Sequence, residues 1–144
     1  MLNTAIMNVT KTYLNDLTYR VIGCAIEVHK HLGPGLIESV YEKCFLKELG
    51  LKGIQYKNQF WVPVNYKGLM CDTELRLDVL VEDVLCVELK AVEGLLPIHD
   101  GILLTYMRML QRPKGILINF HCLNIFKEGQ KTLVNELFAA LPEQ

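Results

Sequence analysis

Three residues of this chain could do chemistry together: Asp78, Glu88 and Lys90, in the run RLDVLVEDVLCVELKAVE over residues 76–93. Two carboxylates can hold a divalent cation against a phosphate group, because hard cations prefer oxygen ligands. A lysine beside them can orient a water molecule and offset negative charge. The set could therefore hydrolyse a phosphodiester bond if the fold brings the three side chains together.

The spacing of these residues predicts how they are held. Side chains alternate between the two faces of a strand, so Glu88 and Lys90 share a face while their neighbours point into apolar packing. A hairpin centred on Asp83 would place Asp78 directly opposite Glu88, with their β-carbons about 5 Å apart. Carboxylates this close repel each other unless a cation or a proton lies between them. A metal ion is the simplest explanation, although a register shift of one residue would turn Asp78 to the other face.

A solvated strand face is the alternative interpretation of the same charges. Arg76, Asp78, Glu88 and Lys90 could form cross-strand ion pairs, and the pattern D-x9-E-x-K is short enough to favour this interpretation when taken alone. However, the charges are embedded in the strongly apolar run LDVLVEDVLCVELKAV, where a solvated strand would carry more polar residues. The apolar surroundings therefore favour a buried site.

The hydrophobic pattern predicts the elements that must position these residues. Apolar residues at three- and four-residue steps indicate helices, and alternating or continuous short apolar runs indicate strands. We expect helices over 16–31, 36–49, 98–110 and 131–141, and strands over 59–66, 69–81, 84–91 and 115–120. The order α-α-β-β-β-α-β-α predicts an α/β (α+β) fold in which helices flank a mixed four-stranded sheet.

Length and composition indicate one globular domain over residues 1–144, with residues 1–14 expected to form a loosely ordered arm because their pattern is weak. Half of the residues are apolar and 22% are charged, which fits a protein with a core. No apolar run approaches about 20 residues, so no membrane span is expected, and the N-terminal residues lack a secretory signal pattern. The five cysteines are widely spaced, which indicates free thiols in a reducing cytoplasm rather than a zinc site or disulfides.

The formal net charge of −1 excludes a surface coated with Lys and Arg for constitutive duplex binding. It does not exclude a nuclease, because acidic metal ligands lower the charge count and a bound cation restores positive potential at the site.

The segment GLIESVY over residues 35–41 matches the motif that names the GxxExxY family. The segments EVHKHLGPGLIESVYEKCFLKELG, VELKAVEGLLPIHDGILLTY and GILINF also resemble that family, and the similarity extends over roughly residues 15–135. The family is placed in the PD-(D/E)xK nuclease superfamily. The resemblance implies a restriction-endonuclease-like core, a nuclease that uses Mg²⁺ or Mn²⁺, a nucleic acid as substrate and a possible homodimer.

The resemblance also implies a role for each site residue. Glu38 would be the helical acidic residue that faces the metal, directly or through water. Asp78 would be the central metal ligand and Glu88 the second, with the backbone carbonyl of Leu89 as a third. Lys90 would position the attacking water and stabilise charge in the transition state.

Three further positions are expected to support the site or to limit it. Tyr41 lies a helical turn from Glu38 and could orient that carboxylate by a hydrogen bond. His99 could lie near the phosphate or cap the helix over residues 98–110, and Tyr106 is a supporting residue of the same stretch. Ile102 stands where family members carry a glutamine whose amide could bind phosphate or water. This departure leaves open an alternative function: a nuclease-fold module that has lost activity and binds nucleic acid or a protein partner.

Overall fold

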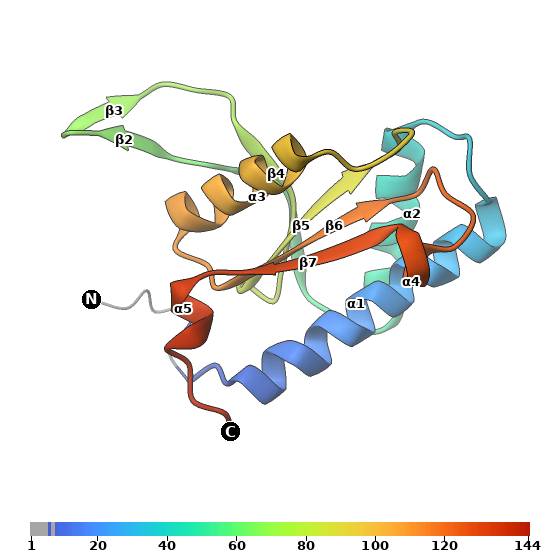
Figure 1. The fold of residues 1–144 in the computed structure, drawn as a ribbon, viewed down its shortest axis with the longest axis horizontal. Helices are drawn as coiled ribbons and strands as arrows, with labels where there is room; N and C mark the ends of the chain where they lie inside the picture. Colours follow the sequence, from blue (N-terminus) through green and yellow to red (C-terminus); the bar gives the residue numbers. More distant parts are fainter. Residues whose placement is uncertain (1–5, 7) are drawn as a thin grey trace.

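A five-stranded mixed sheet forms the centre of the protein. The computed structural model describes residue 6 and residues 8–144. The strands lie in the order β1 (Tyr56–Trp61), β4 (Arg76–Val81), β5 (Leu85–Lys90), β6 (Lys114–Asn119) and β7 (Gln130–Val134). Only β5 and β6 are parallel; the other neighbours are antiparallel. The helices α1 (Lys11–Leu32) and α2 (Glu38–Leu51) cover one face, and α3 (Pro97–Leu110) covers the other (Figure 1).

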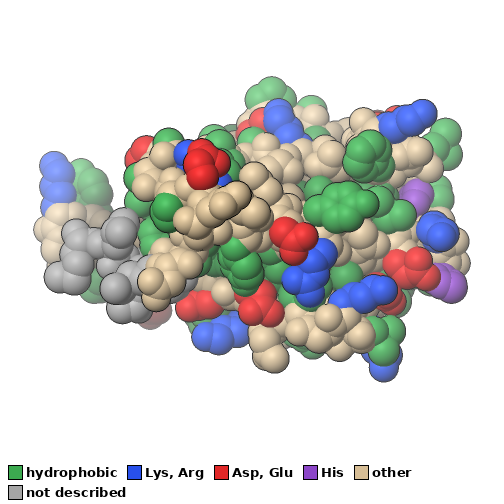
Figure 2. Space-filling model, turned by 90° about the horizontal axis from the view of Figure 1, so that it is seen from below, with side chains coloured by type: hydrophobic (Ala, Val, Ile, Leu, Met, Phe, Trp, Pro, Cys, Tyr) green, Lys and Arg blue, Asp and Glu red, His purple; other side chains and the backbone are tan. Residues whose placement is uncertain are grey.

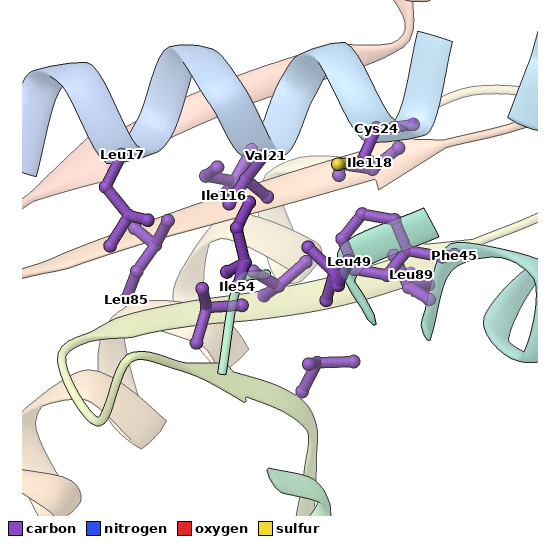
Figure 3. Close-up of a cluster of buried hydrophobic side chains, with 14 of the residues drawn as sticks. Leu17, Val21, Cys24, Phe45, Leu49, Ile54, Leu85, Leu89, Ile116 and Ile118 are labelled. Carbon is purple, nitrogen blue, oxygen red and sulfur yellow. The ribbon is translucent and has the colours of Figure 1, made fainter. Parts of the chain in front are cut away.

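Each face of the sheet carries its own apolar core. On one face, Leu17 and Val21 of α1 pack against Ile116 of β6 (Figure 3). On the other face, the side chains of α3 pack against residues of β4, β5 and β6. All six residues of β6 are buried, because this strand lies between the two helical layers.

The first helix begins earlier than the sequence predicts. The side chain of Thr10 accepts a hydrogen bond from the backbone N–H of Tyr13 at 3.0 Å and caps α1, which starts at Lys11 rather than at Asp16. Leu14 is fully buried in the core. The expected arm over residues 1–14 is therefore wrong for residues 11–14, and its residues 1–5 and 7 lie outside the described part of the chain.

The two long strands expected over 59–66 and 69–81 are each divided in two. Pro63 cannot donate to a ladder, and the chain leaves the main sheet there. The strands β2 (Val64–Tyr66) and β3 (Leu69–Cys71) then form a separate antiparallel hairpin that projects from the body (Figure 1). The chain returns to the main sheet at β4.

The helix expected over residues 131–141 is wrong. The residues form the strand β7, which pairs antiparallel with β6, and then the single turn α5 (Glu136–Ala139). The single turn α4 (Ile125–Glu128) precedes β7. Pairing with the otherwise open edge of β6 outweighs local helix propensity, so the sheet has five strands rather than the expected four.

The surface carries charges of both signs. On the face drawn in Figure 2, acidic, basic and apolar side chains are interspersed, as the net charge of −1 suggests. Within the described residues, no helix combines the length and the apolar character that a membrane crossing requires. All five cysteines are free thiols, of which two are buried.

Candidate metal centre

Asp78 and Glu88 face each other at the open end of the β4–β5 hairpin. The backbone ladder pairs residues 79–81 with residues 85–87, and the next position brings Asp78 opposite Glu88. At this position, side-chain carboxylates accept the hydrogen bonds of backbone N–H groups, in place of backbone-to-backbone ladder bonds. The N–H of Asp78 donates to Glu88 Oε1 at 3.0 Å, and the N–H of Leu89 donates to Asp78 Oδ2 at 2.8 Å. The hairpin is centred on Asp83, as the sequence predicts.

Burial makes this pair of carboxylates electrostatically unfavourable. Glu88 is only 6% exposed. Burial, and next the charge of Asp78, raise the pKa of Glu88 to about 8. Burial also raises the pKa of Asp78, although the Leu89 N–H and then the charge of Lys90 lower it. The two carboxyl groups therefore hold a proton near neutral pH, and a cation would allow both to ionise.

Lys90 completes the charged group on this face of the hairpin. Its Nζ lies 3.9 Å from Glu88 Oε2, and its side chain is 24% exposed. Val87 and Leu89 are fully buried in the cluster that packs against α1 and α2. The alternation predicted from the sequence is therefore present: charges lie on one face of β5 and apolar side chains on the other.

The helix α2 adds two carboxylates, of which the sequence reasoning identified one. Burial, and next the charge of Asp78, raise the pKa of Glu38, whereas Lys90 lowers it. The same two causes raise the pKa of Glu42, one helical turn further on. Both glutamates therefore lie within electrostatic reach of Asp78. The i, i+4 spacing of Glu38 and Glu42 was the signal that could have revealed the second glutamate.

Gln59 of β1 is the other residue that the sequence reasoning missed. Its Nε2 donates to Glu42 Oε1 at 2.9 Å. A hydrogen bond to the Gln59 side chain is also among the causes that lower the pKa of Asp78. The sequence carries no local signal for this contact, because it depends on the pairing of β1 with β4 and on the approach of α2.

The predicted hydrogen bond from Tyr41 to Glu38 is wrong. The Tyr41 hydroxyl donates its single proton to the carbonyl of Gly33 and accepts from the N–H of Leu36 at 3.1 Å. The ring is fully buried and stacks on Phe120, with 4.4 Å between the ring centroids. Tyr41 therefore holds the Gly-Pro-Gly turn that leads into α2.

Of the α3 residues expected at the site, His99 has a structural role and Tyr106 lies near the acidic pair. His99 Nδ1 accepts from the N–H of Leu96 at 2.9 Å, so His99 takes the helix-cap alternative. Tyr106 lies near the acidic pair: after burial, the charges of Glu88 and Asp78 raise its pKa. Ile102 is 38% exposed and precedes Tyr106 by one helical turn. The helix α3 thus places a phenol near the acidic pair and, one turn earlier, carries an isoleucine.

The donor set suits a small hard cation. Across residue 6 and residues 8–144, no three His, Cys, Asp or Glu side chains converge closely enough to form a metal cage of their own. Mg²⁺ does not require such a cage, because one or two carboxylates and several waters commonly bind it. In Asp78 and Glu88 a backbone N–H donates to one oxygen of each carboxylate, so both side chains are held in fixed orientations in which they could bind a cation.

Comparison with known families assigns the fold. The model of the PD-(D/E)XK nuclease superfamily matches residues 15–132. The chain belongs to this superfamily. The matched segment includes Asp78, Glu88 and Lys90, whose order follows the pattern in the superfamily name. The mixed sheet between helical layers agrees with the restriction-endonuclease-like core that the family resemblance implies. No curated protein and no solved structure matches the chain.

Proposed function

We propose that this protein is a nuclease of the GxxExxY type that hydrolyses phosphodiester bonds of nucleic acid with Mg²⁺ or Mn²⁺. One observation carries the proposal: Asp78 and Glu88 are fixed face to face by backbone N–H groups, with Lys90 beside them. A solvated strand face would not bury Glu88 to 6% exposure.

Each residue has a distinct part in this proposal. Asp78 and Glu88 hold the cation, and Glu38 approaches from α2, directly or through water. The carbonyl of Leu89 adds a further oxygen. The bound cation would polarise a phosphate oxygen and lower the pKa of a water molecule. Lys90 orients that water and stabilises the negative charge that develops on the phosphate oxygens.

The experiment is a cleavage panel on single- and double-stranded DNA and RNA, with Mg²⁺ or Mn²⁺ added. The wild-type protein is compared with Lys90→Ala and with Lys30→Ala, which removes a 70% exposed lysine of α1. We expect cleavage to fall at least about 100-fold in Lys90→Ala, because it loses a group that acts in the transition state, and to be unchanged in Lys30→Ala. Equal cleavage by the Lys90→Ala and wild-type proteins would overturn the role of Lys90.

A second candidate function is a binding module that keeps the fold without turnover. Ile102 motivates it, because an isoleucine cannot supply the amide that family members place on this helix. Retention of nucleic acid without cleavage in the same panel would favour this function. We further propose that the protein acts in the cytoplasm, where free thiols persist, and that two copies pair to cut both strands of a duplex.

A further inference from the structure

Gln59 has an unusual backbone conformation for a residue within a strand. Its φ is +51°, in the left-handed region that residues with a side chain rarely adopt. The residues on either side of Gln59 pair with the residues on either side of Asp78, so Gln59 stands opposite Asp78 across the β1–β4 ladder. A strained residue at this position calls for a physical reason.

The contacts of the Gln59 side chain supply that reason. Its amide nitrogen donates to Glu42 Oε1 at 2.9 Å. Its side chain also comes from the position directly opposite Asp78, and it helps to lower the pKa of that carboxyl group. A primary amide has two donor hydrogens, so it can join two carboxylates that would otherwise repel each other. Gln59 thus links α2 to β4 on the side of Asp78 that faces away from Glu88.

We infer that Gln59 is a positioning residue, and that its amide, anchored by Glu42, fixes the orientation of the Asp78 carboxylate toward the cation. The inference rests on the proposed function and deepens it. Asp78 is then held from two sides, by the Leu89 N–H and by Gln59. The alternative is that Gln59 only ties α2 to β1, in which case its loss would change stability and nothing else.

The two roles can be separated with Gln59→Gly, because glycine removes the amide and also relieves the left-handed strain. The matched control is Lys67→Gly, at φ +49° in the β2–β3 turn, which relieves similar strain in the hairpin that lies outside the main sheet and its acidic pair. Affinity for Mn²⁺ is measured by calorimetry on the purified full-length chain. We expect it to fall at least about tenfold in Gln59→Gly and to stay at the wild-type value in Lys67→Gly. Wild-type affinity in Gln59→Gly would overturn the inference.

A cation-free measurement separates failure of this inference from failure of the proposed function. Urea midpoints without metal are compared for wild type, Gln59→Gly, Asp78→Asn and the double variant. If the amide of Gln59 binds the Asp78 carboxylate, as we infer, the effects of the two substitutions on the midpoint should be non-additive. Additive effects would refute the inference even if the wild-type protein binds Mn²⁺. Absence of Mn²⁺ binding by wild type would refute the proposed function. The comparison of urea midpoints among the four proteins would still decide whether Gln59 acts on Asp78.

Discussion

The two ends of the β4–β5 hairpin are built from the same strands, but one end serves stability and the other end carries the candidate metal site. At the turn, Val81 and Leu85 are fully buried and pair through backbone hydrogen bonds. At the open end, the carboxylates of Asp78 and Glu88 accept hydrogen bonds from backbone N–H groups, and the backbone ladder stops. The turn end contributes apolar burial to stability, whereas the open end places two acidic groups where they are unfavourable without a cation. Stability and function are thus separated along one hairpin by only a few residues.

We expect the largest effect on cleavage when the same substitution, Asp to Asn, is made at each end of the hairpin and the two variants are compared. Asp78→Asn keeps the acceptor for the Leu89 N–H but removes a charge from the open end. We expect cleavage to fall about 10³-fold or more, because a metal ligand contributes several kcal/mol to the transition state. Asp83→Asn makes the same change at the turn, where the carboxylate contacts Arg112 at 3.1 Å. Cleavage rates should show wild-type turnover for Asp83→Asn; a similar loss in both variants would break the comparison.

A cavity at the turn end should affect stability and not the site. Leu85→Ala removes a fully buried side chain, which typically lowers the free energy of unfolding by about 2–5 kcal/mol. We expect the urea midpoint to fall accordingly, while Mn²⁺ affinity of the folded protein stays within about twofold of wild type. A large loss of affinity would show that the two ends are coupled.

The open end should weaken the metal-free protein as pH rises. The pKa of Glu88 is raised from 4.5 to about 8, so the folded state retains a proton that the unfolded state releases. The stabilisation from this proton is fully present below pH 4.5 and is lost as pH rises toward 8. Glu88→Gln should remove the trend and be more stable than wild type by at least about 1 kcal/mol at pH 8. Urea unfolding at pH 5, 6.5 and 8 measures the difference, and a gap that does not grow with pH would contradict this cause.

The smallest expected effect lies at Tyr41, beside the open end. Tyr41→Phe removes the hydroxyl bonds to Gly33 and Leu36 but keeps the stacking on Phe120. We expect a loss of about 1 kcal/mol in the free energy of unfolding and an unchanged affinity for Mn²⁺. Thermal unfolding measures the change in stability, and calorimetry measures the affinity for Mn²⁺. A loss of affinity without a loss of stability would restore the direct role of Tyr41 toward Glu38.

The hairpin and the tail show where sequence reasoning works and where it stops. The register that joins Asp78 to Glu88 was predictable, because an apolar alternation on each strand and a tight turn at Asp83 allow few pairings. The strand β7 near the C-terminus was not predictable, because it forms through pairing with β6 and its own residues carry no strong strand pattern.

The site shows the same division. The residues of the short motif were predictable from their types, as was the face that Glu88 and Lys90 share. The spacing from Glu38 could have revealed Glu42. The hydrogen bond between Gln59 and Glu42 could not be predicted, because it needs the approach of α2 and a left-handed residue in β1. The hydrogen bond expected from Tyr41 failed because unpaired backbone groups of a turn were nearer partners for its hydroxyl.

The central claim is that the paired carboxylates form a cation site, and titration calorimetry with Mn²⁺ at pH 8 tests it most directly. The titration compares wild type with Asp78→Asn at the open end and Asp83→Asn at the turn. We predict binding of a cation by wild type and by Asp83→Asn, and none by Asp78→Asn. Equal binding by all three proteins, or no binding by wild type at millimolar Mn²⁺, would contradict the claim.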